Sequence, residues 1–348
     1  RRGPGPPAGT VSAVSVGAVR KSDNAQACVP AFANVTKNIT FACSYTNPGS
    51  SSAALRLAGT PLNAAGNAAA ACDAAGRSVA VAFNSAGVGS VSAQYADVGQ
   101  LGVTGRYTSV SGPDAGVNMQ GSASFVVAPA SFAFSGVSPG PLTAGGAFAA
   151  TVTARNAAGA TTPNFGREAV PESATLSWIR RSPTGGGAVN GNFSGTLGAF
   201  SAGAASGSNL VWTEVGTGDL VATLTSGSYL GSGLTATGTT GSGGAVGPFR
   251  PYRLSTSAGA ACGSFTYGGQ PFPVTVRALN TLGNVTANYD GSGATILSYV
   301  RVVTLSEGSG NVLGSLTGTV TQSSFTVGVG TGTAVYAFTV KATGPQTP

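Results

Sequence analysis

Histidine is absent from the 348-residue sequence, and charged residues make up only 8% of it, about a third of the share found in soluble globular proteins. Without histidine, neither a Ser-His-Asp nor a Cys-His catalytic arrangement can be built, and a metal site of mixed cysteine and histidine ligands is excluded. Lysine is scarce too: Lys21, Lys37 and Lys341 are the three in the chain, and none stands in a Ser-x-x-Lys motif. The sequence therefore favours a protein that is not an enzyme.

Long apolar runs are also missing. Hydrophobic residues make up 42% of the chain, yet no stretch reaches the roughly 18 apolar residues of a membrane-spanning helix, so no membrane span is expected. Val, Leu, Phe and Tyr recur throughout, which is typical of a folded chain and not of a disordered one. With 55 glycines and few strong helix formers, the composition indicates an all-β extracellular protein.

The positive charge is scattered along the chain. The net charge is +7, from 17 basic and 10 acidic residues, but the arginines mostly stand singly and form no basic stripe of the kind that binds nucleic acid. We therefore expect charges on solvent-exposed faces and no nucleic-acid partner. The closest pair of acids, Glu168 and Glu172, is interpreted as part of a polar loop, and no loop resembles a dense Ca²⁺ site. No cofactor or metal is expected.

One strand-like pattern occurs twice, as FAATVTARNAAGATTPNFG at residues 148–166 and FPVTVRALNTLGNVTANYDG at residues 272–291. Apolar side chains alternate with others, the period of a strand buried on one face, and the segment after each strand has the composition of a turn. The two copies align without a gap and so indicate a repeated unit. Identical pairs are Phe148/Phe272, Thr151/Thr275, Val152/Val276, Ala154/Ala278, Asn156/Asn280, Gly159/Gly283, Thr162/Thr286 and Asn164/Asn288.

A second pattern extends the repeat into the first third of the chain. Residues 95–107, YADVGQLGVTGRY, match residues 212–224, WTEVGTGDLVATL, as aromatic, small, acid, Val, Gly and then an alternating strand. Three units of about 100–130 residues, rich in short strands, predict tandem immunoglobulin-like β-sandwich domains. We expect them at residues 1–129 (with a Gly/Pro-rich N-terminal lead), 130–249 and 250–348, joined by short linkers that favour a rod.

Two acids and several aromatics in these units have competing interpretations. Asp97 and Glu214 stand at equivalent points, each directly before Val-Gly. They are tempting as functional acids, but the favoured interpretation is that each carboxylate accepts hydrogen bonds from backbone N–H groups and holds a hairpin turn. Trp178, Trp212 and the tyrosines could form a sugar-stacking platform, whereas positions in a sandwich core explain Trp212 and Tyr95 equally well.

The four cysteines, Cys28, Cys43, Cys72 and Cys262, form neither a Cys-x-x-Cys zinc pattern nor a redox motif. Three of them lie in the first third of the chain, and Cys43 is on one face of an alternating strand with Ile39, Phe41 and Tyr45. We predict a structural disulfide from Cys43 to Cys72, in preference to Cys28. Such a bond would place the protein in an oxidising compartment.

Several stretches resemble the C-terminal region of MshQ-like proteins, which are encoded with the genes of the mannose-sensitive haemagglutinin (MSHA) type IV pilus of Gram-negative bacteria. The resemblance covers nearly the whole chain in the family's order and includes ACVPAFANVTKNITFACSYTNP, YADVGQLGVTGRY, NFGRE, VGPFRPYRL and AACGSFTYGGQPFPVTVRALN. It implies an exported protein on the cell surface or in the extracellular space, associated with a pilus. It implies no catalytic residue and no particular ligand.

The third unit is short, because Tyr336–Lys341 falls where Trp212–Gly216 stands in the second and the acid-Val-Gly signature is missing. Either the chain is a fragment or this sandwich lacks a strand. One hypothesis is that a strand from another copy, or from a pilus protein, completes it. The candidate donor, TVSAVSVGAV, contains Thr10, Val11, Val14, Val16 and Val19. The alternative is that this segment is the first strand of its own unit.

Two functions remain open at this point. The first is a non-catalytic structural module of a bacterial surface appendage, either a pilus-associated stalk or a filament subunit. The second is an adhesin module whose sandwich loops bind a glycan or a host surface protein. Glycan binding that disappeared when an exposed aromatic was replaced would favour the second.

Overall fold

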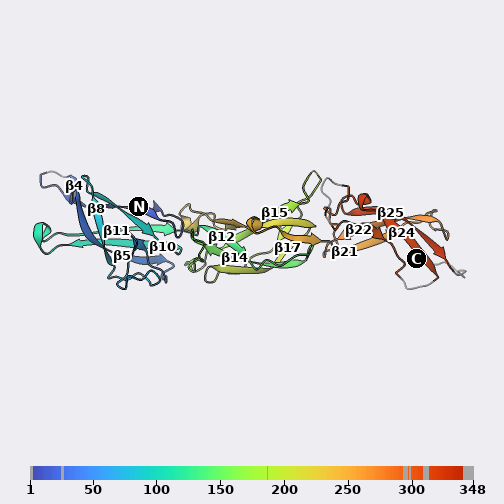
Figure 1. Cartoon of the computed structure of the whole chain (residues 1–348), viewed down its shortest axis with the longest axis horizontal. Helices are drawn as coiled ribbons and strands as arrows, with labels where there is room; N and C mark the ends of the chain where they lie inside the picture. Colours follow the sequence, from blue (N-terminus) through green and yellow to red (C-terminus); the bar gives the residue numbers. More distant parts are fainter. Residues whose placement is uncertain are drawn as a thin grey trace.

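The structure is a computed structural model that describes residues 3–24, 27–185, 187–292, 297, 299–308 and 313–339. The described elements are strands and short 3₁₀ helices, so the fold is all-β, as the composition predicted. The strands form three successive domains along one long axis (Figure 1). The 3₁₀ helices are η1 (Gly112–Asp114), η2 (Tyr229–Gly231), η3 (Thr240–Ser242) and η4 (Gln322–Ser324).

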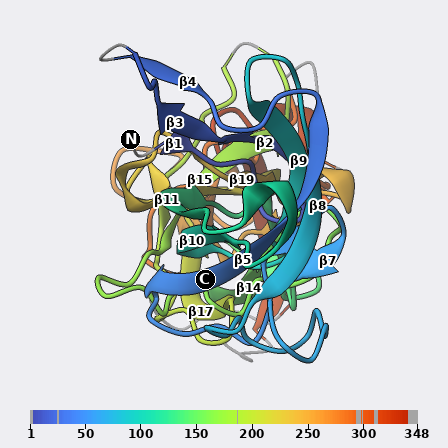
Figure 2. The ribbon, with the colours of Figure 1, turned by 90° about the vertical axis from the view of Figure 1, so that its left-hand side faces the viewer.

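The strands of the first domain form one sheet that curls around a core. They are β1 (Gly3–Pro4), β2 (Ser12–Gly17), β5 (Val35–Asn47), β6 (Arg56–Leu57), β7 (Thr60–Pro61), β8 (Arg77–Phe83), β9 (Val88–Gln94), β10 (Gly99–Thr108) and β11 (Asn118–Val127), with a separate ribbon of β3 (Val19–Lys21) and β4 (Cys28–Pro30). The order around the core is β1-β11-β10-β5-β8-β9, with β2 on β9 (Figure 2). The long strand β5 pairs with β10 over one part of its length and with β8 over another, so it carries the sheet from one face of the sandwich to the other.

The second domain is a sandwich of two sheets. Its strands are β12 (Ser131–Ser135), β13 (Leu142–Thr143), β14 (Ala147–Arg155), β15 (Ala174–Ser182), β16 (Phe193–Ser194), β17 (Ala204–Trp212), β18 (Gly216–Leu224), β19 (Thr237–Thr239) and β20 (Val246–Arg250). One sheet has the order β12-β14-β17-β16 and the other β13-β20-β18-β15, with β19 on β18. Trp212 and Phe249 lie fully buried between them, with ring centroids 5.2 Å apart. Burial of such large apolar surfaces is the main source of stability for a domain of this size.

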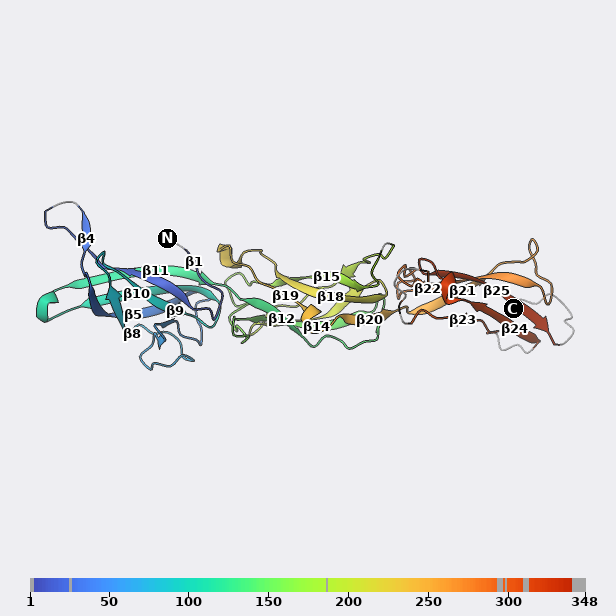
Figure 3. The same ribbon diagram turned by 45° about the horizontal axis from the view of Figure 1, so that its top comes forward.

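The described part of the third domain has one sheet where the second domain has two. Its strands are β21 (Arg253–Ala258), β22 (Pro271–Leu279), β23 (Val303–Thr304), β24 (Gly314–Val320) and β25 (Val329–Phe338), in the order β21-β22-β25-β24-β23. Inward-facing Phe272 and Val276 of β22 pack in one core with Tyr289 and Phe325, which come from the connecting segments. Figure 3 shows this domain at the end of the rod farthest from β4.

An equivalent pair of strands occurs in each of the three domains. β14 and β22 carry the repeated sequence pattern, and each pairs antiparallel with a strand that leads to an aromatic residue: β17 with Trp212 and β25 with Tyr336. In the first domain, β2 pairs in the same way with β9, which is followed by Tyr95. The segment β2 is therefore the counterpart of β14 and β22.

This position corrects the donor-strand hypothesis for Thr10–Val19. The segment forms β2 inside its own domain, which is the alternative that the sequence left open. Val14 and Val16 lie on one face and pack against the core, while Val11 and Val19 are exposed. Local alternation was correct in predicting a strand, but it holds no information on which domain supplies the partner.

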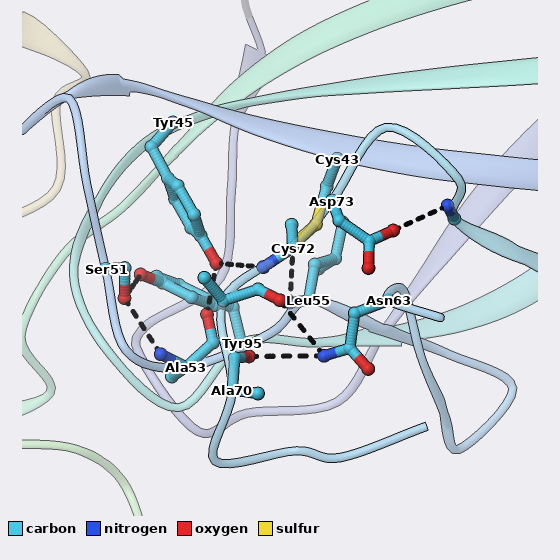
Figure 4. Close-up of a disulfide and its surroundings, with 12 residues drawn as sticks. Cys43, Tyr45, Ser51, Ala53, Leu55, Asn63, Ala70, Cys72, Asp73 and Tyr95 are labelled. Carbon is cyan, nitrogen blue, oxygen red and sulfur yellow. Dashed lines mark hydrogen bonds between the residues drawn. A yellow bond between two sulfur atoms is a disulfide. The ribbon is translucent and has the colours of Figure 1, made fainter. Parts of the chain in front are cut away.

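Cys43 and Cys72, which are 29 positions apart in sequence, form a disulfide with Cα atoms 5.5 Å apart. The bond ties β5 to the loop before β8 (Figure 4). Tyr45 supports this loop, because its hydroxyl donates to the carbonyl of Ala53 at 2.5 Å and accepts from the N–H of Cys72 at 2.8 Å. Cys28 and Cys262 are free and exposed.

Replacing both Cys43 and Cys72 by serine should lower the free energy of unfolding of the first domain by about 3–4 kcal/mol, because the unfolded chain is no longer restrained by a closed loop. Urea unfolding followed by fluorescence checks this. Both tryptophans lie in the second domain, so tryptophan emission follows the unfolding of that domain, while tyrosine emission also follows the first. The double variant Cys28→Ser and Cys262→Ser is the control and should unfold like the parent. Equal stability of all three proteins would contradict a structural role for the bond.

Candidate functional site at the domain junctions

The first junction is organised by a buried carboxylate. Asp97 lies in the turn between β9 and β10, is 3% exposed and accepts a hydrogen bond from the N–H of Val98 at 2.9 Å. The same oxygen, Oδ1, accepts from the N–H of Asn164 in the second domain at 3.1 Å. One carboxylate therefore holds its own turn and the backbone of the next domain.

Backbone groups around Asp97 complete this contact. The Asn156 side chain donates from Nδ2 to the carbonyl of Ala96 at 2.9 Å, while its Oδ1 accepts from two N–H groups of its own turn. The N–H of Ala157 donates to the carbonyl of Ala8 at 2.7 Å. Asparagine suits this position because one amide both holds a turn and reaches across the junction.

The second junction repeats these contacts with a longer acid. Glu214 accepts at Oε2 from the N–H of Val215 and from that of Asn288 in the third domain, at 3.3 and 3.0 Å, and at Oε1 from the N–H of Ala287 at 2.9 Å. Asn280 donates from Nδ2 to the carbonyl of Thr213 at 3.1 Å and accepts at Oδ1 from its own turn. The two junctions thus use matching residues of the repeated sequence.

At each junction, a glycine with a positive φ angle donates a hydrogen bond that orients the neighbouring backbone. Gly9 and Gly145 have positive φ angles of 79° and 77°, a conformation that glycine adopts without strain. Their N–H groups donate to the carbonyls of Tyr95 and Trp212, both at 2.7 Å. This bond presents the preceding carbonyl, of Ala8 or Ala144, to the next domain, and at the second junction Ala144 accepts from the N–H of Thr281 at 3.0 Å.

Burial dominates the electrostatics of both acids. Loss of solvent raises the pKa of Asp97 to about 6, against the lowering effect of the N–H groups of Val98 and Asn164 and of the nearby Arg167. Burial also raises the pKa of Glu214, while the N–H groups of Asn288, Ala287 and Val215 lower it. Backbone donors thus offset part of the cost of burying each charge.

The NFGRE stretch, residues 164–168, contains a second buried acid. Glu168, predicted as part of a polar loop, is 3% exposed and accepts at Oε2 from the N–H groups of Gly166 and Glu172. Its Oε1 accepts from the hydroxyl of Tyr229 at 2.7 Å. The loop is polar, as predicted, but the Glu168 side chain is buried inside it. The next residue also reaches the first domain, because the N–H of Ala169 donates to Oδ1 of Asn47 at 2.8 Å.

The sequence predicted that Asp97 and Glu214 accept backbone hydrogen bonds, and the structure shows these bonds. It did not predict that each acid also reaches into the next domain. The signal was the identity of Asn164 and Asn288 in the two copies, because a turn alone does not require the same side chain there. Tyr95 and Trp212 are buried core residues, whereas Trp178 is half-buried and stacks on Phe193.

Within the described ranges, no cluster of three or more potential metal ligands occurs. In the same residues, no helix has the length and apolar character needed to cross a membrane.

Comparison with known proteins places the two ends of the chain in one family. Residues 4–122 match the family described as "Domain of unknown function (DUF6701), first Ig-like domain", and residues 214–348 match "DUF6701, third domain". The chain carries the first and third domains of the DUF6701 family. The match to the third DUF6701 domain begins at Glu214, the acid of the second junction.

Other comparisons add little to the DUF6701 assignment. No curated protein matches the chain in sequence. Among solved structures, "Structure of surface layer protein SbsC, domains 1-6" aligns over 95% of this chain and 50% of that one, with 11% identity and a TM-score of 0.16. A score this low carries no argument about fold or function.

Replacing Asp97 by alanine should destabilise the first junction by about 1–3 kcal/mol, because the buried N–H groups of Val98 and Asn164 lose their acceptor. Asp97→Asn should retain the junction, since one oxygen accepts both bonds and an amide has such an oxygen. Glu214→Gln should not be tolerated in this way, because Glu214 uses both oxygens and the amide NH₂ would face an N–H donor. Thermal unfolding of the three variants checks this order, and equal stability of Asp97→Ala and Asp97→Asn would contradict it.

The pH profile supplies a second measurement on Asp97. Its folded pKa of about 6 lies above the ordinary value of 3.8, so the folded state binds the proton more tightly. The stability from this group is therefore present below pH 3.8 and is lost as pH rises to about 6. The unfolding free energy of the parent should therefore fall relative to that of Asp97→Asn as the pH rises from 4 to 7. A difference that stays constant would show that Asp97 titrates normally.

Proposed function

We propose that this chain is a non-catalytic, rigid stalk module of a bacterial surface appendage. The observation that carries the proposal is the repeated junction, in which each domain holds the next through a buried acid and three or more hydrogen bonds. Domains joined only by linkers reorient freely, whereas directional bonds at a buried contact fix one orientation. Fixed orientation in series is the property that a stalk needs.

Two further features support an extracellular setting. The Cys43–Cys72 disulfide is typical of proteins that fold in an oxidising compartment. The resemblance to MshQ-like proteins implies export from a Gram-negative bacterium and association with a pilus. We infer that the module stands at the cell surface, next to pilus proteins or other copies of itself.

The adhesin alternative is less well supported. Trp212 and Tyr95 belong to domain cores and present no face to a ligand. Trp178 packs against Trp212 and Phe193, with ring centroids 4.8 and 5.9 Å apart, so its faces are largely covered by other rings. These three aromatics therefore provide no open sugar-stacking platform.

The rigid stalk predicts a narrow distribution of shapes in solution. Small-angle X-ray scattering of the full chain should fit one extended rod. The double variant Asp97→Ala and Glu214→Ala should fit only an ensemble of bent forms, because both junctions lose their acceptors. Asp97→Asn is the matched control and should scatter like the parent. A parent chain that itself required an ensemble of bent forms would overturn the stalk proposal.

Surface location is tested separately. Immunogold electron microscopy of the native organism, with antibodies against the second domain, should label fibres or stalks outside the outer membrane. Protease added to intact cells should also remove the antigen. Label confined to the cell interior would contradict the proposal, whatever the scattering shows.

A further inference from the structure

One edge of the second domain has no strand beside it. β15 pairs antiparallel with β18, and among the described strands none pairs with its other edge. This open edge lies along one long side of the rod, in the middle of the chain and between two described domains (Figures 1 and 3). The flanking segments are described except for residue 186. The loop before β15 bonds to Tyr229 through Glu168, and the loop after it leads to β16.

The counterpart of β15 in the first domain is covered. That counterpart is β5, because β5 pairs with β10, which follows Asp97 as β18 follows Glu214. On its other edge β5 pairs with β8, over Val35–Phe41. β8 comes after β5 in the chain, whereas the chain after β15 forms β16 and pairs with β17 in the opposite sheet. Within the described residues, the second domain therefore supplies no strand of its own to this edge.

A groove of about 500 Å³ lies beside the open edge. Its lining includes Leu176 and Trp178 of β15 and Phe193 of β16, which are the edge strands of the two sheets. Leu176 and Trp178 are only half-buried, because the two sheets are not joined on this side. In the first domain, alternate apolar side chains of β8 are buried in the core. A strand with apolar side chains at alternate positions is therefore the ligand that this edge and groove fit.

The backbone polar groups of β15 point alternately to β18 and to the open edge. On the β18 side, the carbonyl of Ser173 accepts from the N–H of Thr225. By alternation, the odd-numbered residues up to Ile179 also point to β18. Within the described part of the chain, no hydrogen bond uses the backbone groups that point the other way. These groups belong to Ala174, Leu176 and Trp178.

We propose that two copies of this chain pair antiparallel through the open edge of β15. A two-fold axis at Ser177 places the backbone groups of Leu176 opposite those of Trp178 of the second copy, so that each satisfies the other. The same register places Leu176 beside Trp178 on the groove face and Thr175 beside Ile179 on the outer face. Pairs of apolar and β-branched side chains at opposite positions stabilise such a contact. The two sheets then become one continuous sheet across the axis.

The composition of β15 favours a second copy as the occupant. Exposed strand edges are usually protected by charged residues, proline or a bulge. Ala174–Ile179 contains no proline and no charge, and Ile179 is 52% exposed on the outer face. The bulge and two arginines come only after Ile179. In the two-fold register, Arg180 and Arg181 lie opposite Ala174 and Ser173, so no like charges meet, and β15 itself supplies the alternating apolar side chains.

This inference goes beyond the stalk function and does not depend on it, because this edge can pair whether or not the junctions are rigid. The contact is isologous and closes on two copies. Pairing along a single strand edge buries little surface, which is typical of weak association. The dimer should therefore form at high protein concentration, while dilute chains stay single.

A disulfide across the axis tests the register. Ser177 lies opposite Ser177 of the second copy in a non-hydrogen-bonded pair, whose Cα atoms are about 4.5 Å apart, within the range of a disulfide. Exposed Cys28 and Cys262 are first replaced by serine. In that background, Ser177→Cys should form a linked dimer on mild oxidation.

The matched control is Thr175→Cys, which is exposed on the same face of β15. The two-fold register separates its two copies by about 14 Å along the strands, so it should stay monomeric. Failure of Ser177→Cys to cross-link, or equal cross-linking of both variants, would overturn the proposal.

Sedimentation equilibrium tests the association without a cross-link. Ser177→Lys places two like charges opposite each other and should weaken dimer formation by about tenfold or more. Thr223→Lys adds the same charge at an exposed position of β18 and should associate like the parent. A parent that stays monomeric at every concentration, or equal association of the two lysine variants, would contradict the proposal.

Hydrogen exchange shows whether the occupant belongs to the same polypeptide. The amides of Leu176 and Trp178 should gain protection as the dimer forms, whereas the amide of Ser177, bonded to β18, should be protected throughout. If the amides of Leu176 and Trp178 are already protected where the chain is monomeric, a segment of the same polypeptide covers the edge and the proposal is wrong.

Discussion

The end-to-end arrangement of the domains depends on a carboxylate that is buried in one domain and accepts hydrogen bonds from backbone N–H groups of the next. Burying a charge is costly unless it is hydrogen-bonded. Asp97 and Glu214 are bonded to N–H groups on both sides of a junction. Charge-assisted hydrogen bonds to backbone donors are short-range and directional. Separation or rotation of the domains would therefore leave the carboxylate without its N–H donors in the next domain. The acid therefore contributes more to fixing the angle between domains than to their net attraction.

The far end of the third domain shows what a junction looks like without its acid. Gly269 has a φ of 79° and donates to the carbonyl of Tyr336 at 2.8 Å, as Gly9 and Gly145 do to their aromatic partners. Beyond Tyr336, however, Phe338 stands where the acid would be, 39% exposed, with its ring 4.9 Å from that of Tyr336. The backbone of the junction is kept, while the group that would accept N–H donors from a neighbour is replaced by an apolar ring.

Much of the fold could be predicted because strands leave a period in the sequence. Alternation located β14 and β22, and it also identified the strand nature of β2, but a period of two says nothing about which strand lies alongside. That is why the sequence alone could not decide whether Thr10–Val19 pairs inside its own domain, as it does in β2, or with another chain. Contacts across a junction leave no period either. The two matched asparagines, Asn164 and Asn288, were visible in the repeat, but the sequence alone could not show that their N–H groups lie beside the acid of the preceding domain.

The two junctions differ in how they accommodate a proton. At Asp97, both accepted bonds go to Oδ1, and within the described part of the chain Oδ2 has no hydrogen-bond donor. A proton on Oδ2 therefore removes the buried charge without displacing a donor, which agrees with a pKa raised to about 6. Glu214 has N–H donors on both oxygens, so a proton on either oxygen weakens it as an acceptor for the third domain. The extra methylene of Glu214 thus gives a second contact with the next domain, and the N–H donors there offset part of the rise in pKa that burial causes.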